Sequence, residues 1–282
     1  MLQDTDMYVQ RIAAFSDGSN GGNPAGVVLC DVLPTPASMQ ALAAEIGYSE
    51  TVFAAPDGGD WRTRYFAPEM EVPFCGHATI ALGAALAVTQ GDGVFALRLN
   101  EARITVAGRQ SAMGLSAALQ SPLTHSTIAD QDLVDRILRL FAYTVADLDL
   151  RLPPAIAYAG ARHLVVALAD RQKLAAMQYD LDAGRELMID AGLVTISLIH
   201  AENADRFHAR NAFAAGGVYE DPATGAAAAA ALAGYLRDLD WPHGGAIEIR
   251  QGDDMGIPCR LRAEITSEPG ASIRISGSAR IL

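Results

Sequence analysis

The chain has 282 residues, enough for one large domain or two domains of about 140 residues each. Half of the residues are hydrophobic, 19% are charged and the formal net charge is -12. This composition excludes a disordered chain, and it argues against a nucleic-acid partner, which would require a basic surface. The three cysteines are widely spaced, so they imply neither a disulfide framework nor a zinc site.

Two features of the sequence argue against secretion and membrane insertion. The first residues include Asp4 and Asp6, whereas a secretory signal begins with basic residues. The longest apolar run, residues 226–236, is too short to span a bilayer. We therefore expect a soluble, cytoplasmic protein with no membrane partner.

The first half predicts strands interrupted by two helices. Thr35 and Pro36 predict a helix N-terminus, with Thr35 as the N-cap and Pro36 at the first helical position, and Gly47 predicts its end. Strands are expected at 8–14 and 27–30 before this helix and at 51–54 and 62–66 after it. A second helix is expected at 78–88, followed by two strands within 95–107 that are joined by a turn near Asn100.

The second half predicts a similar mixture. Residues 113–122 are expected to cross between the halves. Helices are expected at 129–141, 171–179, 184–191 and 226–236, and strands at 161–168, 194–200, 206–210, 246–250, 259–264 and 273–281. Many strands with one apolar helix in each half predict an α+β fold.

Two stretches of the chain match each other at a fixed offset. Adding 146 carries Arg64 onto Arg210 and Cys75 onto Asp221, and it carries the apolar segment 84–87 onto 230–233. A duplicated unit that ends in an apolar helix predicts two similar halves facing one cleft. We expect the N-terminal half to be 1–118, joined by the strand near 273–282, and the C-terminal half to be 119–272, with the active site between them. Each helix N-terminus would be a natural anion site.

Cys75, Gly76 and His77 precede the first apolar helix. A thiol at a helix N-terminus is shifted toward the thiolate, and Gly76 permits a ligand to approach the backbone closely. The alternative is a small buried cysteine in a turn, with His77 as a polar cap.

Asp221 precedes the second apolar helix and Gly225 lies near its start. Asp221 followed by proline fits an ordinary N-cap. Its match to Cys75 under the repeat favours a functional role, as does a glycine where alanine would stabilise the helix by about 1 kcal/mol.

Glu50 stands between the predicted end of a helix and an apolar strand. A lone glutamate there is usually solvated. If it lies in an apolar cleft instead, desolvation raises its pKa toward the range that suits a general acid or base.

Five motifs occur in one order along the chain. They are Gly-Asn-Pro-Ala-Gly-Val-Val-Leu at 22–29, Ser-Glu-Thr-Val-Phe at 49–53, Phe-Ala-Pro at 66–68, Pro-Phe-Cys-Gly-His-Ala-Thr at 73–79 and Glu-Asp-Pro-Ala-Thr-Gly at 220–225. Together they resemble the phenazine-biosynthesis isomerase family, the PhzF-like proteins, over nearly the whole chain.

The resemblance implies a diaminopimelate-epimerase-like fold, in which two pseudo-symmetric domains each wrap a β-barrel-like sheet around a central helix. It implies a homodimer that uses no cofactor and no metal. The family's catalytic glutamate, histidine and aspartate fall on Glu50, His77 and Asp221. The substrate-binding positions expected here are Asn23, Cys75, Gly76, Gly225 and Ala226.

The function expected from this resemblance is proton relocation, with migration of a double bond, on a small carboxylated substrate. The reaction would be similar to that of trans-2,3-dihydro-3-hydroxyanthranilate isomerase. One alternative is an epimerase or racemase that uses Glu50 or Cys75. A two-thiol racemase is disfavoured because Asp221 occupies the second position. The other alternative is a non-catalytic protein of the same fold that binds a small acid.

Overall fold

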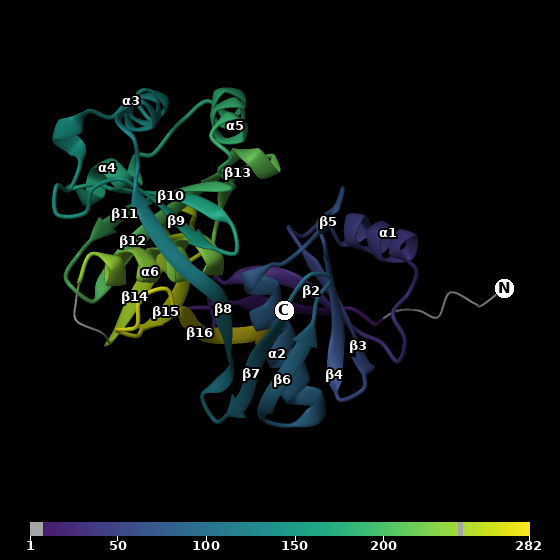
Figure 1. The fold of residues 1–282 in the computed structure, drawn as a ribbon. Coiled ribbons are helices and arrows are strands. Elements are labelled where there is room, and N and C mark those ends of the chain that lie inside the picture. The colour runs from purple at the N-terminus through teal and green to yellow at the C-terminus, as the bar shows by residue number, and fades with distance from the viewer. Residues whose placement is uncertain (1–7, 242–244) are drawn as a thin grey trace. The chain divides into compact units, whose positions relative to one another are not determined.

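Strands β8 (Gly114–Ile128) and β16 (Ser272–Ile281) both contribute residues to the two units into which the chain divides. The computed structural model describes residues 8–241 and 245–282. The first unit comprises Met1–Gln120 and Ser276–Leu282, and the second comprises Ser121–Ile275 (Figure 1).

The first unit is a sheet with one central helix. Its elements are β1 (Gln10–Ala14), β2 (Asn23–Leu29), α1 (Pro36–Ile46), β3 (Thr51–Asp57), β4 (Asp60–Phe66), β5 (Glu71–Val72), α2 (Gly76–Gln90), β6 (Gly93–Arg98) and β7 (Arg103–Ser111). The strand order is β8-β7-β6-β4-β3-β2-β1-β16, with β5 paired to β4. The β2–β3 and β4–β6 pairs are parallel.

Helix α2 is the core of this unit, and Figure 1 shows it among the strands. Every residue from Gly76 to Ala87 is buried, and the helix packs against β7, β2 and β1. The contact with β7 requires glycine on both sides. A Cβ at Gly108 would lie 2.0 Å from the carbonyl oxygen of Gly83. The small residues of α2 therefore set how closely the helix approaches its sheet.

Helix α1 begins and ends where the sequence predicts. The Thr35 hydroxyl accepts the Ser38 N–H at 3.2 Å, which satisfies one donor of the first turn. Gly47 adopts the left-handed conformation with φ 70°, and its N–H donates to Ala43 O. The helix therefore stops four residues before β3, and Glu50 is the residue that immediately precedes this strand.

The second unit repeats the plan with more helices. Its elements are α3 (Gln131–Leu140), η1 (Val145–Asp147), β9 (Ala155–Ala159), β10 (Arg162–Ala167), α4 (Arg171–Ala175), α5 (Leu181–Asp190), β11 (Thr195–Ala201), β12 (Arg206–Phe213), η2 (Ala214–Gly216), β13 (Val218–Asp221), η3 (Gly225–Ala231), α6 (Leu232–Asp238), β14 (Gly245–Gln251), η4 (Asp253–Met255) and β15 (Cys259–Ile265). The order is β8-β9-β10-β11-β12-β14-β15-β16, with β13 paired to β12.

The central helix of this unit has two parts. Its first part, η3, is π-helical and alanine-rich, and its second part, α6, is α-helical. Both parts are almost entirely buried, and η3 packs against β9 and β15. A π-helical turn widens the backbone, and such turns are frequent at functional sites.

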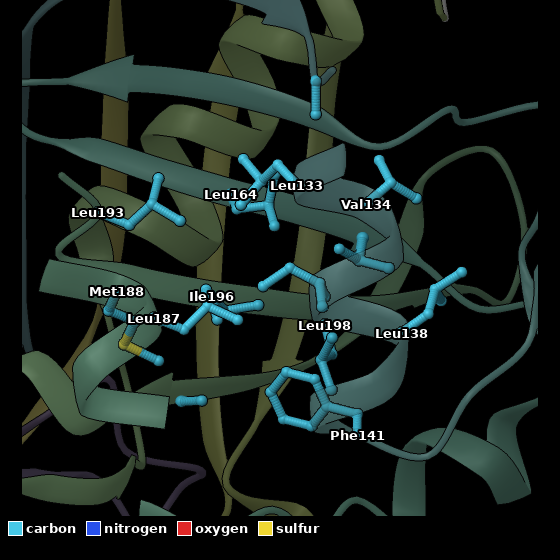
Figure 2. Packing of buried hydrophobic residues seen from close by; sticks show 14 of the residues in the cluster. Leu133, Val134, Leu138, Phe141, Leu164, Leu187, Met188, Leu193, Ile196 and Leu198 are labelled. Carbon is cyan, nitrogen blue, oxygen red and sulfur yellow. The ribbon is translucent and has the colours of Figure 1, made fainter. Parts of the chain in front are cut away.

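A second apolar core lies beneath the helices that cover this sheet, as Figure 2 shows. Leu133 and Ile137 of α3 and Leu187 of α5 pack with Leu164 of β10 and Leu198 of β11. Each fully buried leucine contributes roughly 1.5–3 kcal/mol to folding. This core fixes the outer helices to the sheet.

The predicted α+β class is confirmed, and most predicted elements occur. Strands β5, β9 and β13 were not expected, and the helix predicted at 171–179 ends at Ala175. The reason for the early end lies in Arg210, whose Nη1 donates to the carbonyl oxygens of Ala175 at 2.7 Å and Met177 at 3.4 Å. A longer helix would use the Ala175 carbonyl for its own hydrogen bonds.

Candidate active site

Glu50 is positioned by the pairing of β2 with β3. Its carbonyl oxygen accepts the Gly26 N–H at 3.3 Å, one residue before Gly26 and Thr51 come into register. Gly26 is required there because a Cβ would lie 2.8 Å from Thr51 Oγ1. The Glu50 side chain is only 13% exposed, so it is not the solvated glutamate of the simpler interpretation.

Cys75 and His77 lie at the N-terminus of α2. Cys75 is the N-cap residue, with extended backbone angles and no capping hydrogen bond from its side chain. Its carbonyl accepts both the Thr79 N–H at 3.0 Å and the Thr79 hydroxyl at 2.6 Å. The Tyr65 hydroxyl lies 2.7 Å from Thr79 Oγ1 and ties the first helical turn to β4. The thiol and the imidazole are therefore held on a rigid turn.

The three predicted residues meet around the imidazole ring. Cys75 Sγ lies 3.3 Å from His77 Nδ1, and Glu50 Oε2 lies 3.3 Å from His77 Nε2. Ser49 Oγ also lies 3.3 Å from Nε2. Cys75 is 8% exposed and His77 is 4% exposed. The structure thus brings a thiol, an imidazole and a carboxylate into one buried cluster, in which the thiol also hydrogen-bonds to Glu50.

Burial raises the pKa of the Glu50 carboxyl above its usual value, against smaller lowering effects from hydrogen bonds with Ser49 and Cys75. Its Oε2 atom is buried and has no hydrogen bond, although its distance to His77 suits an ion pair when the imidazole is protonated. A carboxylate oxygen left without a donor in a buried site is ready to accept a proton.

The same donor atoms bear on metal binding. Glu50, Cys75 and His77 each offer one ligand atom within 4.8 Å of the others, the single such cluster found in residues 8–241 and 245–282. A thiol, an imidazole and a carboxylate are donors that bind Zn²⁺, and the same three groups can exchange protons with one another.

Asp221 belongs to a second cluster, within the second unit. It is the last residue of β13, and its Oδ2 accepts a hydrogen bond from Thr224 Oγ1. Thr224 Oγ1 also accepts from Asn211 Nδ2 at 2.8 Å and from Gln251 Nε2 at 3.2 Å. Gln251 further donates to Asp221 O at 2.7 Å. The Asp221 carboxylate is therefore oriented by a side-chain network.

The simpler interpretation of Asp221 as an N-cap is wrong. The N-cap of the second central helix is Thr224, and Gly225 is its first residue. Gly225 is buried and Ala226 is half-buried at this helix start. In the first unit, Gly76 opens α2 and Asn23 is the first residue of β2, where it is 2% exposed. The prediction that the residues of both units form one site stays a prediction.

In each unit, an arginine donates two hydrogen bonds to a glutamate shortly before the central helix, and we call this pair the arginine–glutamate fork. The sequence repeat revealed only the arginines. Arg64 donates from Nε to Glu71 at 2.8 Å, and Arg210 donates from Nε to Glu220 at 2.9 Å, each with a second bond from Nη2. The strand register explains the fork. Glu71 lies opposite Phe66, and Glu220 lies opposite Ala212.

This register corrects the ungapped repeat. The arginines differ by 146 positions, but the glutamates and the glycines that open the helices, Gly76 and Gly225, differ by 149. The hairpin of the second unit is three residues longer. Asp221 pairs with Asn211 as Val72 pairs with Tyr65, so the position that matches Asp221 is Val72 and not Cys75.

Comparisons with known proteins show the family. The family model for phenazine biosynthesis-like proteins, PhzC-PhzF, matches residues 12–282. The chain belongs to this family.

Relatives over most of the chain are named as isomerases. An uncharacterized isomerase of Mesorhizobium japonicum is 34% identical and covers 92% of this chain and 91% of its own. A trans-2,3-dihydro-3-hydroxyanthranilate isomerase of Pseudomonas fluorescens is 30% identical and covers 95% and 94%. The prediction that the chain is an isomerase is confirmed.

Solved structures confirm the predicted diaminopimelate-epimerase-like fold. A PhzF-family protein of Bacillus anthracis has a TM-score of 0.85 at 23% identity and covers 98% of this chain and 97% of its own. A probable proline racemase of Agrobacterium radiobacter has a TM-score of 0.64 at 11% identity and covers 97% and 90%. Among the described residues, no helix is both long enough and apolar enough to cross a membrane.

Proposed function

We propose that this isomerase relocates a proton on a small carboxylated substrate so that a double bond migrates, and that Glu50 is the base. One observation carries the proposal. Glu50 Oε2 is buried, lacks a hydrogen bond, and lies 3.3 Å from His77 Nε2. A carboxylate in that environment gains from accepting a proton in a way that a solvated one does not.

The raised pKa of Glu50 fits this role. A general base works best when its pKa is near the working pH, and burial moves the carboxyl in that direction. His77 adjoins Glu50, and its ring nitrogens supply a second group that can accept and donate protons. Glu50 would remove a proton beside the unsaturated centre, and His77 would help return one elsewhere.

The substrate carboxylate would be held at the start of α2. The N–H groups of a first helical turn have no acceptor inside the helix, and they stabilise an anion or a developing enolate oxygen. The first intrahelical bond of α2 is that of Thr79, which leaves Gly76, His77 and Ala78 as the residues of that turn. Asp221 would act as a further acid or orienting group. None of these steps requires a cofactor.

The named relative suggests the first compound to test. One protein that is 30% identical over 95% of this chain is named as a trans-2,3-dihydro-3-hydroxyanthranilate isomerase. We therefore propose a substrate of that kind, a small carboxylic acid with a C–H bond next to a double bond. The homodimer and the cytoplasmic location stay predictions.

Turnover in D₂O tests this function. The protein is incubated with trans-2,3-dihydro-3-hydroxyanthranilate, and with a set of other small unsaturated carboxylic acids, while proton NMR follows the double bond. We expect solvent deuterium to enter the product as the double bond moves. Acids that raise the melting temperature but never exchange a proton would contradict the proposal and favour a binding protein.

An epimerase is the second candidate, because Cys75 Sγ lies 3.3 Å from His77 Nδ1 and would be a second group that exchanges a proton with the substrate. The same experiment separates the two reactions. An epimerase exchanges the proton at a stereocentre and inverts it, and no double bond moves.

A further inference from the structure

Glu50, Cys75 and His77 place three different donor atoms close together in the first unit. Each side chain offers a single ligand atom, one ring nitrogen in the case of His77, and these three atoms lie within 4.8 Å of one another. The ligand atoms of a tetrahedral Zn²⁺ lie about 3.3–3.6 Å apart, because Zn–N and Zn–O bonds are about 2.0 Å long and Zn–S bonds about 2.3 Å. The metal-free cluster is therefore close to the spacing that the ion requires.

The charges of the metal-free cluster are poorly balanced. The Cys75 thiol hydrogen-bonds to Glu50, so a thiolate there would face a carboxylate. Glu50 Oε2 is buried and has no hydrogen bond, and the Glu50 side chain is only 13% exposed. Two anionic donors that repel each other in a buried site gain a common counter-ion when a dication binds between them. The unpaired oxygen is thus a second observation, beside the spacing, that points to a cation.

The donor set selects the metal. A thiolate and an imidazole are preferred ligands of Zn²⁺, whereas Mg²⁺ and Ca²⁺ take oxygen ligands. Three protein ligands leave the fourth tetrahedral position to water or to a substrate carboxylate. The partial positive charge at the start of α2 opposes the cation. That charge is about half of one elementary charge, whereas two anionic ligands bond to the ion directly, so the ligands outweigh it.

The backbone already holds the three side chains in place. Cys75 and His77 stand on one helical turn, where the Cys75 carbonyl accepts the Thr79 N–H at 3.0 Å and the Thr79 hydroxyl at 2.6 Å. Glu50 is held by the Gly26 N–H, which donates to its carbonyl oxygen at 3.3 Å. Ligands that are held in the metal-free protein lose little conformational freedom when the ion binds.

We infer that Glu50, Cys75 and His77 form an inhibitory Zn²⁺ site. The ion bonds to the Cys75 sulfur, to one ring nitrogen of His77 and to the Glu50 carboxylate, and the thiol proton leaves to solvent. A chelator removes the ion and restores the metal-free cluster.

The metal site does not depend on the proposed function, because binding is measured on the protein without substrate. The inhibition does rest on the proposed function. A proton satisfies the unpaired Glu50 oxygen during catalysis, whereas the ion occupies the carboxylate and the imidazole together, so the zinc-bound protein lacks its base.

The other two cysteines serve as controls. In the part of the chain that the structure describes, neither Cys30 nor Cys259 belongs to a comparable cluster of donor atoms. Cys259 is fully buried, and its thiol donates to the Ile257 carbonyl at 3.3 Å. Cys30 is partly exposed and stands beside Asp31 in the chain. If an accessible thiol and a nearby carboxylate were enough, the ion would bind at Cys30.

Metal titrations of the full chain test the site, with Co²⁺ as the spectroscopic probe for Zn²⁺. A thiolate bound to Co²⁺ gives a charge-transfer band in the near ultraviolet, and tetrahedral Co²⁺ absorbs in the visible. We expect one Co²⁺ per chain with both signals, and Zn²⁺ should displace it. Cys75→Ser should abolish the charge-transfer band and weaken Zn²⁺ binding at least about 100-fold. Glu50→Gln should weaken it about tenfold or more, and Cys30→Ser should leave both signals unchanged.

Three results would overturn the inference. They are a Co²⁺ complex without the thiolate band, loss of that band in Cys30→Ser, and Zn²⁺ binding of wild-type strength in folded Cys75→Ser, which would mean an adventitious ion only. If Cys75→Ser does not fold, wild-type Zn²⁺ affinity in folded Glu50→Gln or His77→Gln has the same meaning.

The inhibition is measured separately, with the substrate identified in D₂O. One equivalent of Zn²⁺ should lower turnover about 100-fold, as loss of the base would, and EDTA should restore it. Full turnover with the site occupied would reject the inhibition. Because the titrations use no substrate, a failure of the proposed isomerase reaction leaves their outcome unchanged.

Discussion

The starts of the two central helices share a scaffold and differ in chemistry. Before each helix, an arginine on one strand donates two hydrogen bonds to a glutamate on the next short strand. At α2, the side chains that follow are Cys75 and His77, with Glu50 beside them and one carboxylate oxygen unpaired. At η3, the Asp221 carboxylate accepts a hydrogen bond from the Thr224 hydroxyl.

This difference suits the two carboxylates to different tasks: Glu50 to proton transfer and Asp221 to orientation. A carboxylate with an unpaired buried oxygen is suited to gain a proton, whereas one held by a hydroxyl that two amide groups fix in turn is suited to hold its place. The duplicated scaffold places a helix N-terminus in each unit, and the residues around each terminus determine what it does. The predictions below test that contrast, in order of decreasing effect.

The arginine–glutamate fork should contribute more to the free energy of unfolding in the second unit than in the first. Arg210 and Glu220 have side chains that are 10% and 4% exposed, whereas those of Arg64 and Glu71 are 17% and 26% exposed. Glu220→Gln strands a buried guanidinium and should cost about 3–5 kcal/mol, whereas Glu71→Gln should cost about 1 kcal/mol. Urea unfolding of the two matched variants measures the difference, and equal losses would show that burial does not distinguish the forks.

Asp221→Asn should lower kcat about 100-fold if Asp221 acts on the substrate as an acid or an orienting charge. The amide keeps the shape of the side chain but carries no charge. Steady-state kinetics with the substrate identified in D₂O measures kcat and KM separately, and Glu186→Gln, at an exposed position, is the control. Wild-type kcat in a folded Asp221→Asn protein would assign Asp221 to structure alone.

Thr224→Val should destabilise the protein by about 1–3 kcal/mol because it leaves buried polar groups without a partner. The Thr224 hydroxyl joins Asp221, Asn211 and Gln251, and Asn211 is fully buried. Thr224→Ser keeps the hydroxyl and should keep most of the stability. Thermal unfolding compares the two, and equal melting temperatures would mean that the network adds nothing to the fold.

Glu50→Gln should have the smallest effect on stability, and its sign depends on pH. Burial raises the folded-state pKa of Glu50 above 4.5. At pH values between 4.5 and this raised pKa, the folded protein therefore binds more protons than the unfolded chain. Wild-type stability therefore falls as pH rises through that window. The variant should match the wild type in acid and have an equal or higher melting temperature at neutral pH. A lower melting temperature at neutral pH would show that Glu50 stabilises the fold as a carboxylate.

Local features of the fold could be predicted from the sequence because they depend on neighbouring residues. Thr35, Pro36 and Gly47 set the ends of α1 through contacts within four residues. The meeting of Cys75 with His77 is likewise a matter of two positions at one helix start. Glu50 reaches them from 25 positions away, and only the family resemblance indicated that approach.

Features set by strand register could not be predicted in this way. The offset of 146 is correct for Arg64 and Arg210, but the longer hairpin before β13 changes it to 149, and no residue type marks the insertion. Asn211 and Gln251 were missed for the same reason, because they join Asp221 only through the pairing of β12 with β13 and β14. Alternate residues of β12 are Phe207, Ala209, Asn211 and Phe213, so the available signal was a polar residue on an otherwise apolar face of the strand.

The central claim is that Glu50 removes the substrate proton, and the rate at which solvent deuterium enters the substrate tests it most directly. The rate is compared among the wild type, Glu50→Gln and Glu71→Gln, whose carboxylate belongs to the same unit but pairs with Arg64. We predict a loss of at least about 100-fold in Glu50→Gln alone, with folding intact. Deuterium entry at the wild-type rate in folded Glu50→Gln would contradict the claim.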